Sequence, residues 1–161
     1  MRIRQVAGAH PDAEALRAGQ RAEIAALCDR PDSEPGTPPT AADVVAFFVA
    51  WDDDARPVGC GGLRALGDGI GDVKRMYVVP EARGTGVADG VLTALEEGAR
   101  GQGWSALRLE TGDGQPAAVR FYERSGYRRI PNFGAYAGVD GSWCFERRLD
   151  AVRACPSPCT G

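Results

Sequence analysis

An arginine and two glycines stand close together in the segment VVPEARGTGVADGVL, residues 78–92, where an apolar run gives way to a helical pattern. Gly84 and Gly86 let backbone N–H groups come close to a ligand, and a helix that follows them directs the positive end of its dipole to the same place. Arg83 adds a permanently charged planar group that suits phosphate oxygens. The segment therefore predicts an anion site, most naturally for phosphate. The alternative is an ordinary glycine-rich turn with an exposed arginine.

Two other phosphate-binding patterns fit this segment less well. A P-loop requires Gly-Lys-Ser/Thr at the end of its glycine turn, whereas Lys74, the only lysine, lies upstream. The dinucleotide fingerprint is closer, because Gly84, Gly86 and Gly90 are followed by Glu110 at the end of the next predicted strand. Its glycine spacing is one residue too long, and the chain after Glu110 is too short for the further strand–helix units of such a fold. A nicotinamide dinucleotide-binding enzyme stays open as an alternative.

The elements that must position this segment alternate between strands and helices. Short β-branched or aromatic runs predict strands at 3–6, 44–51, near Val58, and at 73–79, 104–110, 127–130 and 143–149. Apolar residues at helical spacing predict helices at 12–28, after Val87 and at 116–125. Part of the apolar run 44–51 is also compatible with a helix. A turn in LGDGIGD leads into the strand 73–79, which we expect at the centre of the sheet.

Composition limits the class of protein. A chain of 161 residues can form one domain with a core, and its net charge of −3 has no long run of either sign, which argues against nucleic acid and anionic membranes as partners. No apolar stretch approaches the roughly 20 residues of a membrane span, and the N-terminus does not resemble a signal peptide. We therefore expect a single cytoplasmic domain over residues 1–150 and a flexible tail over 151–161. Cys155 and Cys159 in that tail are too few for a structural zinc site, so no metal is expected.

Two segments together resemble the GNAT superfamily of acetyl-CoA-dependent N-acetyltransferases. The first is similar to the family's acyl-CoA motif, Arg/Gln-x-x-Gly-x-Gly/Ala, and consists of Arg83, Gly84, Thr85, Gly86, Val87 and Ala88. The second, QPAAVRFYERSGYRRI, is similar to Asn-x-x-Ala-x-x-x-Tyr-x-x-x-Gly-Phe/Tyr and supplies Ala118, Tyr122, Gly126 and Tyr127. Gln115 stands where many members have asparagine, and Gly90 lies inside a helix, where glycine costs about 1 kcal/mol relative to alanine unless packing requires it. The close resemblance covers residues 57–149.

The resemblance implies the fold and the cofactor site. The expected fold is α/β, a single GNAT-type domain whose mixed, mostly antiparallel central sheet is flanked by helices and splays between its two central strands. The N–H groups of 84–88, with Arg83 alongside, would hold the pyrophosphate of acetyl-CoA, the cosubstrate, and Gln115 and Ala118 would lie near it. The pantetheine arm would follow the strand edge at Met76, Tyr77 and Val78, where a backbone N–H would stabilise the oxyanion.

The catalytic groups are expected around the splay. In the family a tyrosine lies beside the sulfur, and a phenol with a pKa near 10 suits protonation of the leaving thiolate, so Tyr122 is the expected acid. Without the motif, Tyr122 would be taken as a core aromatic. Asp72 and Glu110, at the ends of adjacent predicted strands, are candidates for the base or for anchoring a cationic acceptor, and the alternative is that both simply pair with arginines. His10, the only histidine, is expected to be a surface residue.

The function predicted from the sequence is transfer of the acetyl group of acetyl-CoA to a primary amine of a small molecule or peptide, by direct attack in a ternary complex. A CoA-binding regulatory module without turnover is the competing hypothesis. Dimers are common in the family, so a homodimer is an expected assembly. The acceptor, the base and the roles of the tail cysteines stay open.

Overall fold

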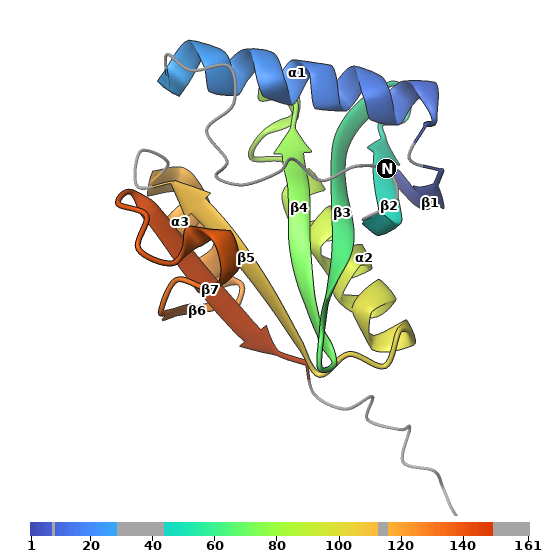
Figure 1. The fold of residues 1–161 in the computed structure, drawn as a ribbon. Coiled ribbons are helices and arrows are strands. Elements are labelled where there is room, and N and C mark those ends of the chain that lie inside the picture. The colour runs from blue at the N-terminus through green and yellow to red at the C-terminus, as the bar shows by residue number, and fades with distance from the viewer. Residues whose placement is uncertain (8, 29–43, 113–115, 150–161) are drawn as a thin grey trace, which may run out of the picture.

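The structure is a computed structural model that describes residues 1–7, 9–28, 44–112 and 116–149 (Figure 1). Its strands are β1 (Arg2–Val6), β2 (Val44–Trp51), β3 (Pro57–Gly67), β4 (Ile70–Val78), β5 (Ala106–Gly112), β6 (Arg128–Ile130) and β7 (Ser142–Arg148). Its helices are α1 (Pro11–Cys28), α2 (Val87–Gly101) and α3 (Pro116–Arg124), with the short 3₁₀ helices η1 (Pro80–Ala82) and η2 (Gly134–Tyr136). The predicted strands and helices are confirmed, and the ambiguous run at 44–51 is a strand.

The seven strands form one sheet in the order β1-β2-β3-β4-β5-β7-β6. Every neighbouring pair is antiparallel except β4 and β5, which are parallel. These two strands pair only from Ile70 to Asp72 of β4, opposite Ala106 to Arg108 of β5. Beyond that point they diverge (Figure 1). The predicted fold class, an α/β domain with a mixed, mostly antiparallel sheet that splays between its central strands, is confirmed.

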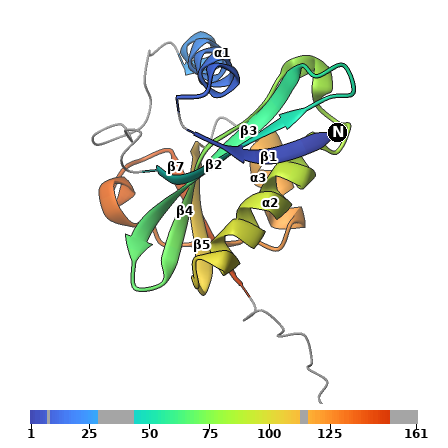
Figure 2. The ribbon, with the colours of Figure 1, turned by 90° about the vertical axis from the view of Figure 1, so that its right-hand side faces the viewer.

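Helices cover the two faces of the sheet. The apolar face of α2 packs on one face with Leu63, Val73, Leu107 and Leu109, and the buried ring of Tyr122 from α3 joins the same cluster. Ala13 and Leu16 of α1 pack on the other face. Figure 2, a side view, shows α1 and α2 on opposite sides of the strands.

Two short features of the sequence fix local geometry, one at the turn into β4 and one where α2 meets β1. Asp68 and Gly69, both with positive φ (57° and 75°), form a two-residue hairpin turn between β3 and β4, which is the usual role of an Asp-Gly pair. Gly90 of α2 lies against β1, where a Cβ would stand 2.9 Å from the Ile3 side chain. Close packing of α2 on the N-terminal segment thus explains the glycine inside the helix.

No helix in the described ranges combines the length and the apolar character needed to cross a membrane. Gln115, Cys155 and Cys159 lie outside the described residues, as does the tail 151–161.

Candidate active site

Strand β4 carries a bulge where it leaves β5. Between the register pairs Cys60↔Tyr77 and Gly62↔Lys74, β4 contains one more residue than β3. Arg75 in this interval has a φ of 58°, in the left-handed region that residues other than glycine seldom adopt. The Cys60 thiol donates to the Arg75 carbonyl oxygen at 3.3 Å. Bulges re-aim strands next to functional sites, and this one lies at the start of the splay.

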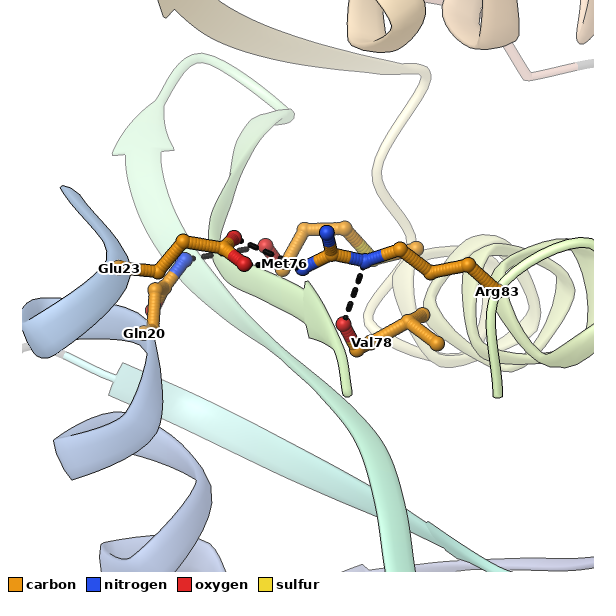
Figure 3. Close-up of polar contacts among 5 residues, drawn as sticks. All are labelled: Gln20, Glu23, Met76, Val78 and Arg83. Carbon is orange, nitrogen blue, oxygen red and sulfur yellow. Dashed lines mark hydrogen bonds and ion pairs between the residues drawn. The ribbon is translucent and has the colours of Figure 1, made fainter. Parts of the chain in front are cut away.

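The edge of β4 that β5 has left presents two backbone carbonyl groups. Because the N–H of Val79 donates toward β3 at 2.9 Å and backbone groups of successive strand residues alternate in direction, the carbonyl groups of Met76 and Val78 point away from β3. Gln20 Nε2 of α1 donates to the Met76 oxygen at 3.0 Å, and Arg83 Nε donates to the Val78 oxygen at 3.0 Å (Figure 3). Where the pantetheine arm is predicted, this edge of β4 therefore has no neighbouring strand from the described part of the chain, and the side chains of Gln20 and Arg83 satisfy its acceptors.

The turn from β4 to α2 has the backbone predicted for an anion cradle. Gly84 and Gly86 have φ values of 78° and 90°, and an added Cβ at either position would meet no heavy atom within 4 Å. Gly86 is the N-cap of α2, and no side chain caps that helix end. The uncapped N–H groups and the dipole of α2 are both available to an anion. The Thr85 hydroxyl donates to the Ala82 carbonyl oxygen, while Val87 is buried and Ala88 is half-buried against the core.

Arg83 is directed toward α1. Its Nη2 donates to both carboxylate oxygens of Glu23, at 2.7 and 2.8 Å, and its guanidinium lies 5.8 Å from the centre of the Tyr77 ring (Figure 3). Its side chain is 47% exposed. The arginine predicted to lie alongside a pyrophosphate is thus at the cradle, with a carboxylate as its present partner.

Tyr122 of α3 is buried in the main core and makes edge contacts with Phe121 and Tyr127. Burial raises its pKa, so the phenol stays protonated at neutral pH, as a proton donor must. The neighbouring Tyr127 donates to Glu96 at 3.0 Å, and Glu96 also accepts from Arg147 at 2.8 Å. Tyr122 therefore is a core aromatic, which is compatible with the predicted acid role. Ala118, one turn earlier, packs partly buried against the same core.

Asp72 lies where β4 and β5 part, but it is 0% exposed. It accepts from Arg64 at 3.1 Å and lies 3.3 Å from Lys74 Nζ, which in turn contacts the Tyr136 hydroxyl and ring. Its Oδ1 is buried and finds no hydrogen-bond partner within residues 1–7, 9–28, 44–112 and 116–149. Burial raises the pKa of Asp72, and the charges of Lys74 and Arg64 oppose the rise. This enclosure favours the alternative in which Asp72 pairs with basic residues, and its catalytic role stays a prediction.

Glu110 lies on β5 beyond the last pair with β4, opposite Cys144 of β7, and is partly exposed. The pKa of the Cys144 thiol is raised chiefly by burial, and the carboxylates of Glu110 and Asp72 add to the rise. Of the two, Glu110 is the one with exposed surface.

Two groups at the site gave no signal in the sequence. Gln20 and Glu23 lie on α1, where polar residues are expected to face solvent, and only the tertiary structure brings them to β4. His10 is not part of the site: its Nδ1 accepts from the Asp12 N–H at 3.1 Å, at the start of α1. Within the described residues no cluster of His, Cys, Asp and Glu has the composition of a metal site.

Comparison with known proteins identifies the family and the fold of the chain. The model of the acetyltransferase (GNAT) family matches residues 13–127. A protein of Azospirillum brasilense named IAA acetyltransferase is 41% identical over 106 residues, which is 65% of this chain and 69% of that protein. A crystal structure of a Klebsiella pneumoniae protein assigned as an acyl-CoA N-acyltransferase is 31% identical, with a TM-score of 0.78 over 92% of this chain and 97% of the other. A Bacillus anthracis protein assigned as a streptothricin acetyltransferase, solved in complex with acetyl coenzyme A, shares the fold at 19% identity, with a TM-score of 0.58 over 65% of this chain and 62% of the other.

Proposed function

Because the chain belongs to the acetyltransferase (GNAT) family, we propose that it transfers the acetyl group of acetyl-CoA directly to a primary amine in a ternary complex. The observation that carries the proposal is the continuity of one surface. The edge of β4 that faces away from β3 runs through Met76 and Val78 into the Gly84–Gly86 turn. It continues to the N-terminus of α2, which no side chain of the described residues caps. An extended ligand with amides at one end and phosphates at the other matches such a surface.

The residues of the cradle fit the coenzyme. Backbone N–H groups from Gly84 to Ala88 would donate hydrogen bonds to the pyrophosphate oxygens, since the positive φ values of Gly84 and Gly86 leave room for close approach. Arg83 would add a charge-assisted contact after turning from Glu23. The carbonyl groups of Met76 and Val78 would accept the pantetheine amides. When bound, acetyl-CoA supplies the activated acyl group for transfer.

The chain itself would stabilise the developing oxyanion and supply one proton to the leaving thiolate. The backbone N–H of Met76 at the bulge is the proposed donor to the oxyanion that develops on the acetyl carbonyl, because it points away from β3, whereas the N–H of Tyr77 faces β3. The protonated phenol of Tyr122 is the proposed donor to the leaving thiolate. No covalent enzyme intermediate is required, because the amine attacks the thioester carbonyl directly.

Glu110 is the better of the two candidates for contact with the acceptor amine. It lies beyond the paired part of β5 and is partly exposed, whereas Asp72 is enclosed by Arg64 and Lys74. Glu110 would either accept the ammonium proton through water or anchor the ammonium group.

The acceptor is proposed only as a class. The relatives are named for different acceptors, IAA in one case and streptothricin in another. Because these names do not point to one acceptor, we propose only a class for this chain, a primary amine of a small molecule or peptide.

A thiol-release screen tests the proposal. Purified protein and acetyl-CoA are incubated with a broad amine library, free thiol is measured, and acetylated products are read by mass. We expect thiol release with a subset of primary amines. Binding of acetyl-CoA without release for any amine would instead indicate a regulatory module. Preference for NAD(P) over coenzyme A would indicate a nicotinamide enzyme.

A further inference from the structure

Side chains of α1 reach both parts of the proposed coenzyme surface. Gln20 and Glu23 are three residues apart, so they share one face of the helix, and this face is turned to β4 (Figure 3). Gln20 donates to the Met76 carbonyl oxygen, and Glu23 accepts two hydrogen bonds from Arg83.

Each of these contacts has the chemistry of a coenzyme contact. An amide N–H on the Met76 carbonyl is what an amide of the pantetheine arm would provide. A carboxylate that accepts a pair of hydrogen bonds from a guanidinium presents oxygens much as a phosphate does. Gln20 and Glu23 thus imitate, in the same order along β4, the amide and the anionic ends of the coenzyme.

Both contacts can be exchanged for coenzyme contacts at little cost in stability. Gln20 Oε1 is buried and has no hydrogen-bond partner among the described residues, which leave the Gln20 amide half satisfied in this position. The Arg83–Glu23 pair is partly exposed, with side-chain exposures of 47% and 31%, and pairs of this kind contribute little net stability. The helix itself is attached elsewhere, since the Trp51 indole N–H donates to Asp12 at 2.8 Å. Side chains can therefore release β4 while α1 keeps its place.

We propose that Gln20 and Glu23 form an internal plug that competes with coenzyme A for the Met76 carbonyl and for Arg83. The plug rests on the proposed function, because it requires that the coenzyme binds along β4. Coenzyme binding then exchanges one set of partners for another and frees both side chains of α1 from the strand edge. The plug lowers the affinity for acetyl-CoA and leaves the edge and the arginine satisfied when the coenzyme is absent.

Calorimetry of acetyl-CoA binding to Glu23→Gln tests the plug. Loss of the competing carboxylate should tighten binding about threefold, because an ion pair of this exposure is worth about 0.7 kcal/mol and tenfold corresponds to about 1.4 kcal/mol. Glu14→Gln is the matched control, since Glu14 lies on the same helix, pairs with Arg17 at 3.5 Å and is 67% exposed. This variant should bind as the wild type does.

Two further measurements separate competition from a general charge effect. In an Arg83→Ala background, Glu23→Gln should no longer change acetyl-CoA affinity, because the guanidinium for which Glu23 and the coenzyme compete is absent. S-acetyl-pantetheine, which lacks the pyrophosphate, should bind equally to wild type and Glu23→Gln. Unchanged or weaker acetyl-CoA binding by Glu23→Gln, or tightening that persists without Arg83, overturns the plug. If neither the wild type nor any variant binds acetyl-CoA, the proposed function itself fails.

Discussion

Substitution of Gly86 by valine tests the phosphate cradle most directly. Gly86 has a φ of 90°, and a Cβ at this position would meet no protein atom within 4 Å. The cost of the substitution in the free protein is therefore one of backbone strain rather than of collision. An L-residue in the left-handed region costs about 1–2 kcal/mol, which is small against the 5–15 kcal/mol that stabilises a typical domain. The variant should fold, with a melting temperature lower by about 2–8 °C.

The effect on binding should be far larger than the effect on folding. A branched side chain would stand where the backbone must approach the phosphate oxygens, and hydrogen bonds to a charged group are worth about 1.5–3 kcal/mol each. Loss of even one such bond predicts acetyl-CoA binding weakened at least tenfold. Titration calorimetry of the free protein with acetyl-CoA measures this without any need for an acceptor.

Gly103→Val is the matched control. Gly103 follows the other end of α2, has a φ of 81° and likewise has no heavy atom within 4 Å of an added Cβ. It should lose a similar amount of thermal stability and keep its affinity for acetyl-CoA. Wild-type affinity in a folded Gly86→Val protein, or equal weakening in both variants, would show that the glycine turn does not hold the coenzyme.

Three further predictions concern side chains of the site. Arg83→Ala should weaken acetyl-CoA binding about tenfold in calorimetry, because a charge-assisted contact with phosphate is lost. It should cost little thermal stability, because the pair of Arg83 with Glu23 is partly exposed. Full retention of affinity would contradict a contact with the phosphates. Tyr122→Phe should lower kcat about a hundredfold with acetyl-CoA affinity nearly unchanged. Tyr127→Phe, which removes the hydrogen-bond donor to Glu96, should lower stability more than kcat. An unchanged kcat for Tyr122→Phe, under conditions where chemistry limits the rate, would leave Tyr122 with a core role only. Glu110→Gln should lower kcat/KM for a cationic amine about tenfold or more, which steady-state kinetics would measure. Asp72→Asn should change mainly the pH dependence of stability, which denaturation at several pH values would measure.

The sheet and the glycine turn that precedes α2 could be predicted because local patterns encode them, whereas the binding of phosphate by that turn stays a prediction. Alternating or β-branched runs gave the strands, and Val87, Val91, Leu95 and Ala99 recur at the spacing of one helix face, which the structure buries. The splay between the central strands was inferred from family resemblance alone. No local pattern near Asp72 or Arg108 states that the pairing of β4 and β5 stops there.

The plug could not be predicted, because its contacts join residues far apart in the sequence. Gln20 meets Met76 across 56 residues, and Glu23 meets Arg83 across 60. On α1 both look like ordinary polar residues of an exposed helix face. The sequence also does not indicate the bulge at Arg75, because an arginine does not predict a left-handed backbone conformation. Such features depend on how elements pack, and periodicity carries no information about that.

The different results expected for Asp72 and Glu110 follow from burial. Burial raises the pKa of Asp72 above its ordinary value of 3.8, so over the interval above that value the folded state holds a proton that the unfolded state has released. The wild type should therefore lose stability as the pH rises through this interval, and Asp72→Asn should lack that loss. Glu110 is partly exposed and lies on β5 beyond its last pair with β4, so its charge can act on an amine that enters the splay between these strands. If Glu110 is the base, Glu110→Gln should act on kcat and displace the acidic limb of the pH profile; if it is an anchor, the variant should act on KM and weaken the salt dependence. Unchanged kcat and KM in both variants would mean that solvent or another group deprotonates the amine, and that these carboxylates serve the fold alone.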